Sequence, residues 1–512
     1  KVLLLPTSRG SCSGSGVLLQ LALNGMAPAA LVFSSPEEVL TLGAVIADRL
    51  FDRPVAVVRL TPQDFAAVSN APSATLTGTM LEAGGSQYNL TRLDDADLEV
   101  SPADRRCLAG DPAHPETLAL SIVCTMAAAL GATRLVDVSR GHIDGCILAH
   151  NANLIFAERM AALGARVRIP TTINAISVDR RSCGKQGFPD AFRDKSIRLA
   201  DAYVQMGARP TFTCAPYLLP DPPRFGERIG WSESNAVVFA NSVLGARTSK
   251  LPDYLDLFVA MTGRAPDAGM YLVERRRPSL IIDVVTPSDH DDSLWPLIGW
   301  LAGRLAVDCV PLLRGLNHLA PTTDDLRAMC AAFGTTSGAP MLHVAGVTPE
   351  AELAPLDGTG LRRITQASLA EAWHALNTGP ETVDLVAVGS PHASFGEVRR
   401  FADLMDGRPR NGDTEVIVTI GRDVQEQARA AGLIDRLVSS GVKVIPDLCW
   451  CSITEPVFPP DARNLMTNSG KYAHYAPSLS GRTVRFGSLR DCAECAISGT
   501  ASKHPPDWLA VT

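Results

Sequence analysis

The sequence predicts an α/β fold in which parallel sheets carry the functional loops. Short apolar runs alternate with longer helical stretches, and many of these runs end in polar, loop-forming residues. This alternation is typical of parallel sheets, whose active sites gather beyond the carboxyl ends of the strands. The length of 512 residues and the apolar fraction of 46% indicate a multidomain protein with well-packed cores. We therefore expect the functional residues in loops that follow strands.

The first 60 residues predict a small α/β unit of their own. Its predicted strands and helices are Leu3–Pro6, Val17–Asn24, Ala29–Phe33, Glu37–Leu50 and Val55–Leu60. The segment Thr61–Gly78 contains two prolines and several small residues, which predicts a linker. The chain begins at Lys1 on a strand-like run and not at Met or a signal sequence, so we expect part of this unit to be missing.

The rest of the chain predicts a larger body with the same alternation. Its clearest predicted helices and strands are Thr117–Leu130, Arg134–Val138, Ile147–Leu163, Val167–Pro170, Ala339–His343, Asp384–Gly389 and Lys443–Pro446. Polar residues follow these strands, among them His142, Asn174 and His392. The fold class predicts a site among such loops.

The bulk properties exclude several classes of protein. No apolar run reaches the roughly 18 residues that a membrane-spanning helix needs. The net charge of −7 argues against a general binder of nucleic acid or anionic lipid. The 12 cysteines are scattered along a chain without an export signal, which favours reduced thiols or metal ligands over disulfides. We expect a cytoplasmic, monomeric enzyme with a small-molecule substrate.

Four cysteines near the C-terminus give the strongest chemical signal. Cys449 and Cys451 precede the run Thr467–Lys471, and Cys492 and Cys495 follow it. Paired thiols can hold a soft metal, and the hydroxyls, amide and ammonium of the run suit a small anionic substrate. A structural zinc site and four buried thiols are the alternatives at this spacing.

Three other loops offer ligand or substrate groups. Arg9–Gly16 is a Gly- and Ser-rich turn between a strand and a helix, where backbone N–H groups attract anions, although a purely structural turn is equally compatible. It has neither the Lys ending of a P-loop nor a dinucleotide fingerprint. Ser234 and Asn235 open a small-residue helix, for which a capping role is the simpler interpretation. Cys214 follows a strand-like run, a better position for a ligand than a helix interior.

Several of these strings together resemble the aconitase X family, a divergent branch of the aconitase superfamily. The strings that carry the resemblance are Gly10–Ser15, Thr213–Tyr217, Trp231–Ala236, Ala240–Thr248 and Thr467–Lys471. The small unit fused ahead of the body, with the insert-like Met80–Leu90, is similar to the bacterial single-chain type. The resemblance implies a small swivelling domain over residues 1–75, an aconitase-like body over 76–512, and an iron–sulfur cluster between them.

The resemblance also implies the ligands of the cluster. They would be Cys214, Cys449 and Cys492, with Cys451 and Cys495 as substitutes. Archaeal relatives carry a Cys where this chain has Ser390, which leaves the third ligand and the cluster type open. We expect a 2Fe–2S cluster, with 3Fe–4S and 4Fe–4S as alternatives.

The implied reaction assigns roles to further residues. A serine of the swivelling domain is the base in aconitases, and Ser11 matches it; Lys471 would be the second catalytic residue, paired with the substrate carboxylate. The residues expected to contact the substrate are Ser13, His142, Ser234, Asn235, Asn468 and Ser469.

The single-chain type implies the dehydration of cis-3-hydroxy-L-proline. The base would remove the C2 proton, a Lewis-acidic iron would assist the departing C3 hydroxyl, and the enamine would tautomerise to Δ1-pyrroline-2-carboxylate. Dehydration of mevalonate 5-phosphate or of another small hydroxy acid is the alternative. An iron-sensing, RNA-binding regulator fits poorly with the net charge of −7.

Overall fold

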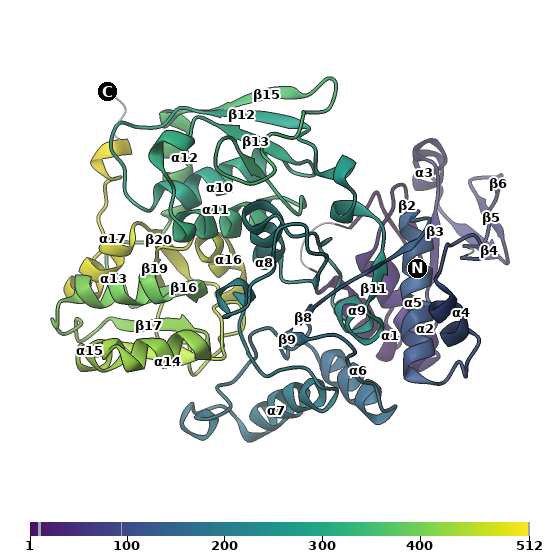
Figure 1. Cartoon of the computed structure of the whole chain (residues 1–512), viewed down its shortest axis with the longest axis horizontal. Helices are drawn as coiled ribbons and strands as arrows, with labels where there is room; N and C mark the ends of the chain where they lie inside the picture. The colour runs from purple at the N-terminus through teal and green to yellow at the C-terminus, as the bar shows by residue number, and fades with distance from the viewer. Residues whose placement is uncertain (9–11, 94, 510–512) are drawn as a thin grey trace.

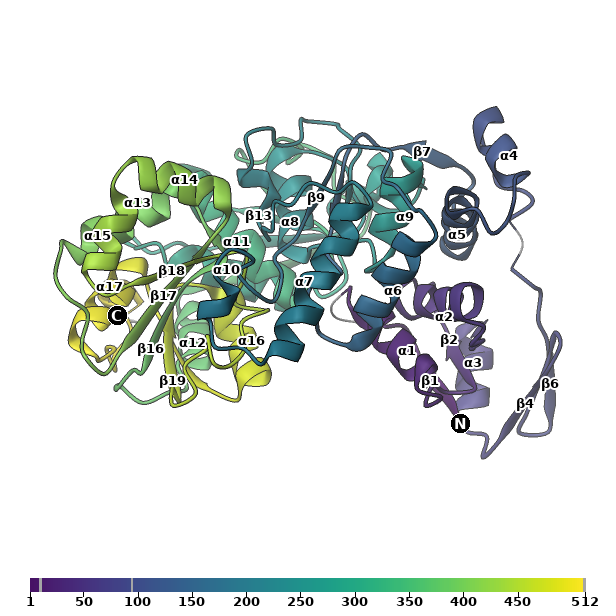
Figure 2. The same cartoon turned by 90° about the horizontal axis from the view of Figure 1, so that it is seen from below.

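The computed structural model describes residues 1–8, 12–93 and 95–509 and confirms the predicted α/β class (Figure 1). In this part of the chain, four sheets are wholly parallel and two small ones are antiparallel. The N-terminal sheet lies at one end of the molecule and the C-terminal sheet at the other (Figures 1 and 2). None of the described helices combines the length and the apolar character that a bilayer span requires.

The N-terminal unit is a three-stranded parallel sheet with helices, as predicted. Its central strand β2 is apolar and buried at every position, which is typical of a strand covered on both faces. The elements are β1 (Val2–Leu5), α1 (Gly14–Leu23), β2 (Ala30–Phe33), α2 (Val39–Phe51) and β3 (Ala56–Arg59).

The segment predicted as a linker is folded, so that prediction is wrong. Thr61 caps helix α3 (Pro62–Ser69) by accepting the N–H of Asp64, and Pro62 occupies the first turn, where its missing N–H has no cost. An antiparallel sheet follows, made of β4 (Ala74–Thr77), β5 (Met80–Ala83) and β6 (Ser86–Asn89). A domain boundary at residue 75 therefore falls inside β4.

The small unit is docked on the body through a shared apolar core. Leu19 of α1 and Ile46 of α2 belong to the same buried cluster as side chains of three body helices. Those helices are α5 (Pro115–Leu130), α6 (Asn151–Ala162) and α9 (Leu255–Thr262). This docking brings Cys12, shortly before α1, against Asp144 and Asp253 of the body.

A short parallel sheet lies next to this docking surface. It consists of β8 (Gly141–Ile143), β9 (Thr171–Ile173) and β10 (Gly230–Trp231), in the order β10-β8-β9. We predicted His142 in a loop, but it lies within β8. The prediction was wrong because a strand of two or three residues has too short an apolar pattern to be recognised. The remaining elements here are α4 (Pro102–Leu108), β7 (Leu135–Asp137), α7 (Asp190–Gln205), α8 (Ser234–Phe239) and β11 (Arg264–Pro266).

Two larger parallel sheets complete the body. The four-stranded sheet, in the order β14-β13-β12-β15, is flanked by helices. Its elements are β12 (Leu280–Val284), α10 (Leu294–Leu305), β13 (Pro311–Arg314), α11 (Thr323–Thr336), β14 (His343–Val344), β15 (Gly360–Ile364) and α12 (Gln366–Leu376). The five-stranded sheet, in the order β18-β17-β16-β19-β20, comprises β16 (Leu385–Ala393), α13 (Phe395–Met405), β17 (Glu415–Ile420), α14 (Arg422–Ala430), α15 (Leu433–Ser439), β18 (Lys443–Pro446), β19 (Asn464–Thr467), α16 (Gly470–Ser480), β20 (Thr483–Phe486) and α17 (Leu489–Ser498).

The central strand β16 is irregular near its carboxyl end. Its pairing with β17 shifts register between Val388 and Ala393. Gly389 has a φ of 96°, and a Cβ there would come 2.2 Å from the carbonyl oxygen of Thr419, so only glycine fits. The irregularity re-aims the following residues, including His392, away from a regular ladder.

Candidate active site

Polar side chains from two parallel sheets meet beyond the carboxyl ends of their strands. Asp144 follows β8, Asn174 follows β9, and Glu233 comes shortly after β10. Lys471 comes from the five-stranded sheet, in the first turn of α16 after β19. Asn174 donates hydrogen bonds to Asp144 and Glu233, and Lys471 donates one to Glu233. This is the location at which α/β folds place active sites.

The ion pair between Lys471 and Glu233 is the centre of this network. Nζ of Lys471 lies 2.8 Å from Oε1 of Glu233, and both side chains are largely buried. Burial works to raise the pKa of Glu233, but Lys471 and the amides of Asn235 and Asn174 outweigh it and hold the pKa at about 2. Burial also works against a charge on Lys471, yet the attraction of Glu233 raises its pKa above the ordinary value. Both groups are therefore charged at neutral pH.

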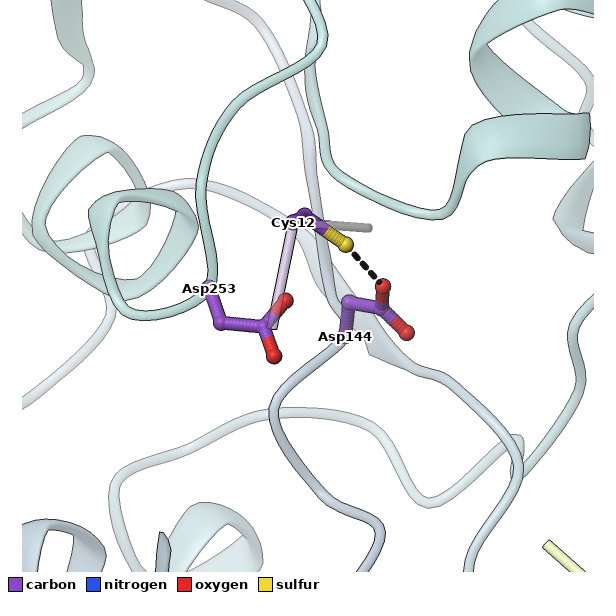
Figure 3. A group of neighbouring side chains, drawn as sticks. All are labelled: Cys12, Asp144 and Asp253. Atoms are coloured by element: carbon purple, nitrogen blue, oxygen red, sulfur yellow. Dashed lines mark hydrogen bonds between the residues drawn. The ribbon is translucent and has the colours of Figure 1, made fainter. Parts of the chain in front are cut away.

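A second group joins the small unit to the body. Figure 3 shows the Cys12 thiol directed toward Asp144, with Asp253 alongside. The thiol donates to Oδ2 of Asp144 at 2.9 Å, and the carbonyl of Cys12 accepts the N–H of Asp253 at 3.1 Å. One ligand atom of each residue lies within 4.8 Å of the other two, so the group can hold a metal ion.

Burial raises the pKa of all three residues of this group. Burial, then the charge of Glu233, raises the pKa of Asp144 to about 7. Burial and the neighbouring Asp144 raise the pKa of Asp253 well above its usual range. Burial and both carboxylates also raise the pKa of the Cys12 thiol. The group therefore favours protons or another cation at neutral pH.

Three thiols gather beside these residues. Cys214 and Cys449 form a small buried cluster, and the partly buried Cys451 packs against it. The backbone N–H of His392 donates to Sγ of Cys214 at 3.3 Å. Hydrogen bonding with Cys214, together with burial, raises the pKa of the Cys449 thiol. Cysteine sulfurs are the usual ligands of iron–sulfur clusters, and negative charge on these three would be balanced in part by Lys471.

Cys492 does not join the other two predicted ligands, and this corrects the predicted grouping. Cys492 and Cys495 lie one turn apart on α17, within an apolar cluster that includes Val386 and Phe401. The C-x-x-C spacing here reflects the buried face of an amphipathic helix. Cys451, predicted only as a substitute, occupies the place beside Cys214 and Cys449.

Three further predicted site residues belong to the small unit and to β8. Ser11 lies outside the described residues. Ser13 is at the start of α1, where its carbonyl accepts the N–H groups of Gly16 and Val17. His142 is fully buried, and its Nδ1 lies 2.7 Å from Oγ1 of Thr172. Burial lowers the pKa of His142 to about 3, so its ring is neutral.

Ser234 and Asn235 flank the ion pair. Glu233, and neither of these two, is the N-cap of α8, and Ser234 is the first residue of that helix. The amide of Asn235 donates to Glu233 at 2.5 Å and to the carbonyl of Cys214 at 3.1 Å, and it accepts from Tyr217 at 2.9 Å. Because these bonds use the groups of the amide, Asn235 orients Glu233 and has little left for a substrate.

The run that contains Lys471 also serves the fold. Ser469 is the N-cap of α16 and accepts the N–H of Tyr472 at 3.0 Å, while its hydroxyl donates to the carbonyl of Ser390. Asn468 is partly buried before this cap. Within residues 1–8, 12–93 and 95–509, the side chains of Asn468 and Ser234 make no hydrogen bond, unlike those of Asn235, His142 and Ser469.

Sequence reasoning missed Cys12, Asp144 and Asp253. Asp144 follows a strand of three residues, which has no visible apolar pattern. Asp253 lies before α9, between Pro252 and Tyr254, where no recognised motif marks it. Glu233 and Asn174 lie in loops that the sequence analysis recognised as polar. Their spacing in the sequence did not indicate that Asn174 would bridge Glu233 and Asp144. The only available signal was position after a strand of a parallel sheet.

Sequence models of the aconitase X family match most of the chain. The matched domains are the swivel domain over residues 1–83, the first domain over 97–274, the second over 278–374 and the third over 383–498. The chain belongs to the aconitase X family. The matched swivel domain corresponds to the N-terminal unit described above.

Named relatives and a solved structure agree with this membership. Cis-3-hydroxy-L-proline dehydratase of Pseudomonas aeruginosa is 46% identical over 530 residues, covering 100% of this chain and 90% of the relative. The protein of the same name from Hypocrea jecorina is 42% identical, covering 99% and 89%. The crystal structure of Thermococcus kodakaraensis aconitase X in its holo-form superposes with a TM-score of 0.71 at 28% identity, covering 78% of this chain and 100% of that one. This chain is therefore a dehydratase, an enzyme of the lyase class.

Proposed function

We propose that this chain dehydrates cis-3-hydroxy-L-proline to Δ1-pyrroline-2-carboxylate. The observation that carries the proposal is the juxtaposition of the buried pair Glu233–Lys471 with the carboxyls of Asp144 and Asp253. An amino acid brings one positive and one negative group to such a site. A phosphorylated hydroxy acid is strongly anionic and would meet several buried carboxylates, which disfavours mevalonate 5-phosphate. The name shared by the two full-length relatives supports the same substrate.

We assign the cluster ligands to Cys214, Cys449 and Cys451. These thiols lie together, with Cys214 and Cys449 buried and Cys451 partly buried; the N–H of His392 donates to Sγ of Cys214, and Lys471 brings positive charge close to all three. When bound, the cluster would supply a Lewis acid for the departing hydroxyl. We keep 2Fe–2S as the predicted type.

The residues of the chain would handle the proton and the substrate carboxylate. Ser11 would take the C2 proton and the C3 hydroxyl would leave with its electron pair, so that this proton and this hydroxide together make up the water lost; the resulting enamine tautomerises to the product. Lys471, oriented by Glu233, would pair with the carboxylate and favour the build-up of negative charge at C2. The charge and cysteine content of the sequence lead us to propose a cytoplasmic monomer as well.

The test separates the base from the cluster ligands. Anaerobically purified wild type should convert cis-3-hydroxy-L-proline, followed by proton NMR, and show visible absorbance from bound iron. Ser11→Ala should keep the iron and lose at least about a hundredfold in kcat. Cys451→Ala should lose both iron and activity, while Cys492→Ala, which changes a cysteine of the apolar core, should keep its iron. Full turnover by Ser11→Ala would remove the base assignment, and loss of iron in Cys492→Ala alone would remove the ligand assignment.

A further inference from the structure

Asp253 is buried and Asp144 partly buried, and among the described residues neither acid has an ion-pair partner. Asp253 is 5% exposed, and its Oδ1 is buried with no hydrogen-bond partner in the described part of the chain. Within the same described residues, the ion pairs include Lys471 with Glu233 but none to Asp144 or Asp253. An unpartnered buried carboxyl oxygen is costly, so within the described residues the site has an acceptor that a bound donor would satisfy.

The surroundings of Asp144 hold its carboxylate in one orientation. Oδ2 accepts from the Cys12 thiol, Oδ1 accepts from Asn174, and the backbone N–H of Asp144 donates to Asp256 at 2.7 Å. A carboxylate oxygen can accept a second bond, so both oxygens retain acceptor capacity. Fixed orientation, free lone pairs and a second carboxyl nearby are the features of a receptor for a cationic donor.

We propose that Asp144 and Asp253 form the subsite for the secondary ammonium of the substrate, with Cys12 as a positioning residue that orients Asp144. The proposal rests on the proposed function and deepens it. A prolinium nitrogen carries two N–H donors, one for each of the two carboxyls, and both bonds are charge-assisted. The carboxylate at the opposite end of the substrate would pair with Lys471, which the bonds of Asn174 and Glu233 link to Asp144.

An ammonium fits the group better than a metal ion. Metal binding would require the Cys12 thiol to lose its proton, and burial beside two carboxylates makes that loss unfavourable. The thiol already donates to Asp144, as a neutral group does. An ammonium leaves the thiol protonated, offers one N–H to each carboxyl and balances the charge of one of them.

This subsite would also decide specificity. A substrate without the amine would leave Asp144 and Asp253 buried and uncompensated. Sites built to hydrogen-bond a polar group reject analogues that lack it far more strongly than apolar pockets reject a missing methylene. The small unit takes part because Cys12 belongs to it while both carboxyls belong to the body.

The experiment compares two inert ligands that differ only at this position. L-proline carries the ammonium, and (S)-tetrahydrofuran-2-carboxylate has a ring oxygen in its place. Their dissociation constants are measured by calorimetry on the cluster-loaded full chain. Wild type should prefer L-proline by at least about tenfold, a preference of the size expected for charge-assisted bonds. A preference below about threefold in the wild type would overturn the subsite without any variant.

Variants then locate the preference. In Asp144→Asn it should fall to within about threefold, and Asp253→Asn should reduce it in the same direction. Asp292→Asn is the matched control, since Asp292 is also largely buried but pairs with Arg400 elsewhere in the body; it should keep the full preference. An Asp144→Asn protein that keeps its iron and still prefers L-proline as strongly as the wild type would sink the assignment.

The remaining outcomes distinguish an ammonium subsite from a metal site. They also distinguish failure of the subsite proposal from failure of the proposed function. If one equivalent of Zn2+ binds the wild type, is lost in Asp253→Asn and is not displaced by L-proline, the group is a metal site and the proposal fails. If the wild type turns over cis-3-hydroxy-L-proline while the variants keep the amine preference, only the ammonium subsite fails. If the wild type binds neither ligand and turns over no hydroxyproline, the proposed function itself fails.

Discussion

The pair Glu233–Lys471 should couple strongly, and its strength can be worked out from the structure. The pKa of Glu233 is held at about 2 and not at the ordinary 4.5, which corresponds to about 3 kcal/mol of favourable interaction with the charged form. Breaking a buried pair by removing one partner costs about 3–5 kcal/mol. The pKa shift also contains the amides of Asn235 and Asn174 and the opposing effect of burial, so we take the expected coupling between the two side chains from the second value, at about 3 kcal/mol.

A double-mutant cycle measures this coupling. Lys471→Met, Glu233→Gln and the double variant are compared with the wild type by urea unfolding. The single changes should each be costly, and the double variant should be far less destabilised than their sum, because it leaves no unpaired buried charge. The exposed pair Lys503–Glu381 is the matched control, with Nζ and Oε1 3.9 Å apart, and it should couple by less than about 1 kcal/mol. Additive effects at the buried pair, equal to those of the exposed pair, would refute the reasoning.

Two further predictions concern the same region. A carboxyl group whose pKa is lowered by folding stabilises the protein fully above the unfolded pKa of 4.5, and this stabilisation is lost as the pH falls toward about 2. The wild type should therefore lose about 3 kcal/mol of unfolding free energy over this range, and Glu233→Gln should not. Urea unfolding at each pH measures the difference. Gly389→Ala should lower stability by more than about 2 kcal/mol, because its Cβ would meet the backbone of Thr419 in a left-handed conformation, and thermal unfolding would show it. Gly407→Ala, with a φ of 68° and open space around the new Cβ, isolates the conformational cost of about 1 kcal/mol; an equal loss in both variants would contradict the steric argument.

The sequence could predict the elements that carry long patterns. The strand at Lys443–Pro446 and the helix ending at Leu130 were predicted within a turn of their observed bounds, because apolar periodicity and a terminal glycine mark them. It could not predict β8 or β10, which have three and two residues. Prolines in Thr61–Gly78 were interpreted as loop signals, whereas Pro62 begins a helix.

The site was predictable only in part, for a similar reason. Lys471 was recognised because it stands in a dense polar run, Cys214 because it follows a strand-like run and Cys449 because it belongs to a cysteine pair, and the resemblance then implied that the two cysteines are ligands. Cys451 and Cys492 both stand in plausible cysteine pairs, and spacing alone could not tell a loop thiol from a thiol on a helix core face. Contacts between Cys12 and Asp144 join residues far apart in the chain, and no local pattern encodes them.

We propose that this site dehydrates an amino acid and not a phosphorylated hydroxy acid. The most direct measurement is a competition in one tube, with anaerobically purified protein and equal concentrations of cis-3-hydroxy-L-proline and mevalonate 5-phosphate. Proton and phosphorus NMR follow the two compounds together. We predict that the hydroxyproline is consumed with formation of Δ1-pyrroline-2-carboxylate while the phosphate ester stays intact. Consumption of the phosphate ester, with the hydroxyproline untouched, would contradict the account.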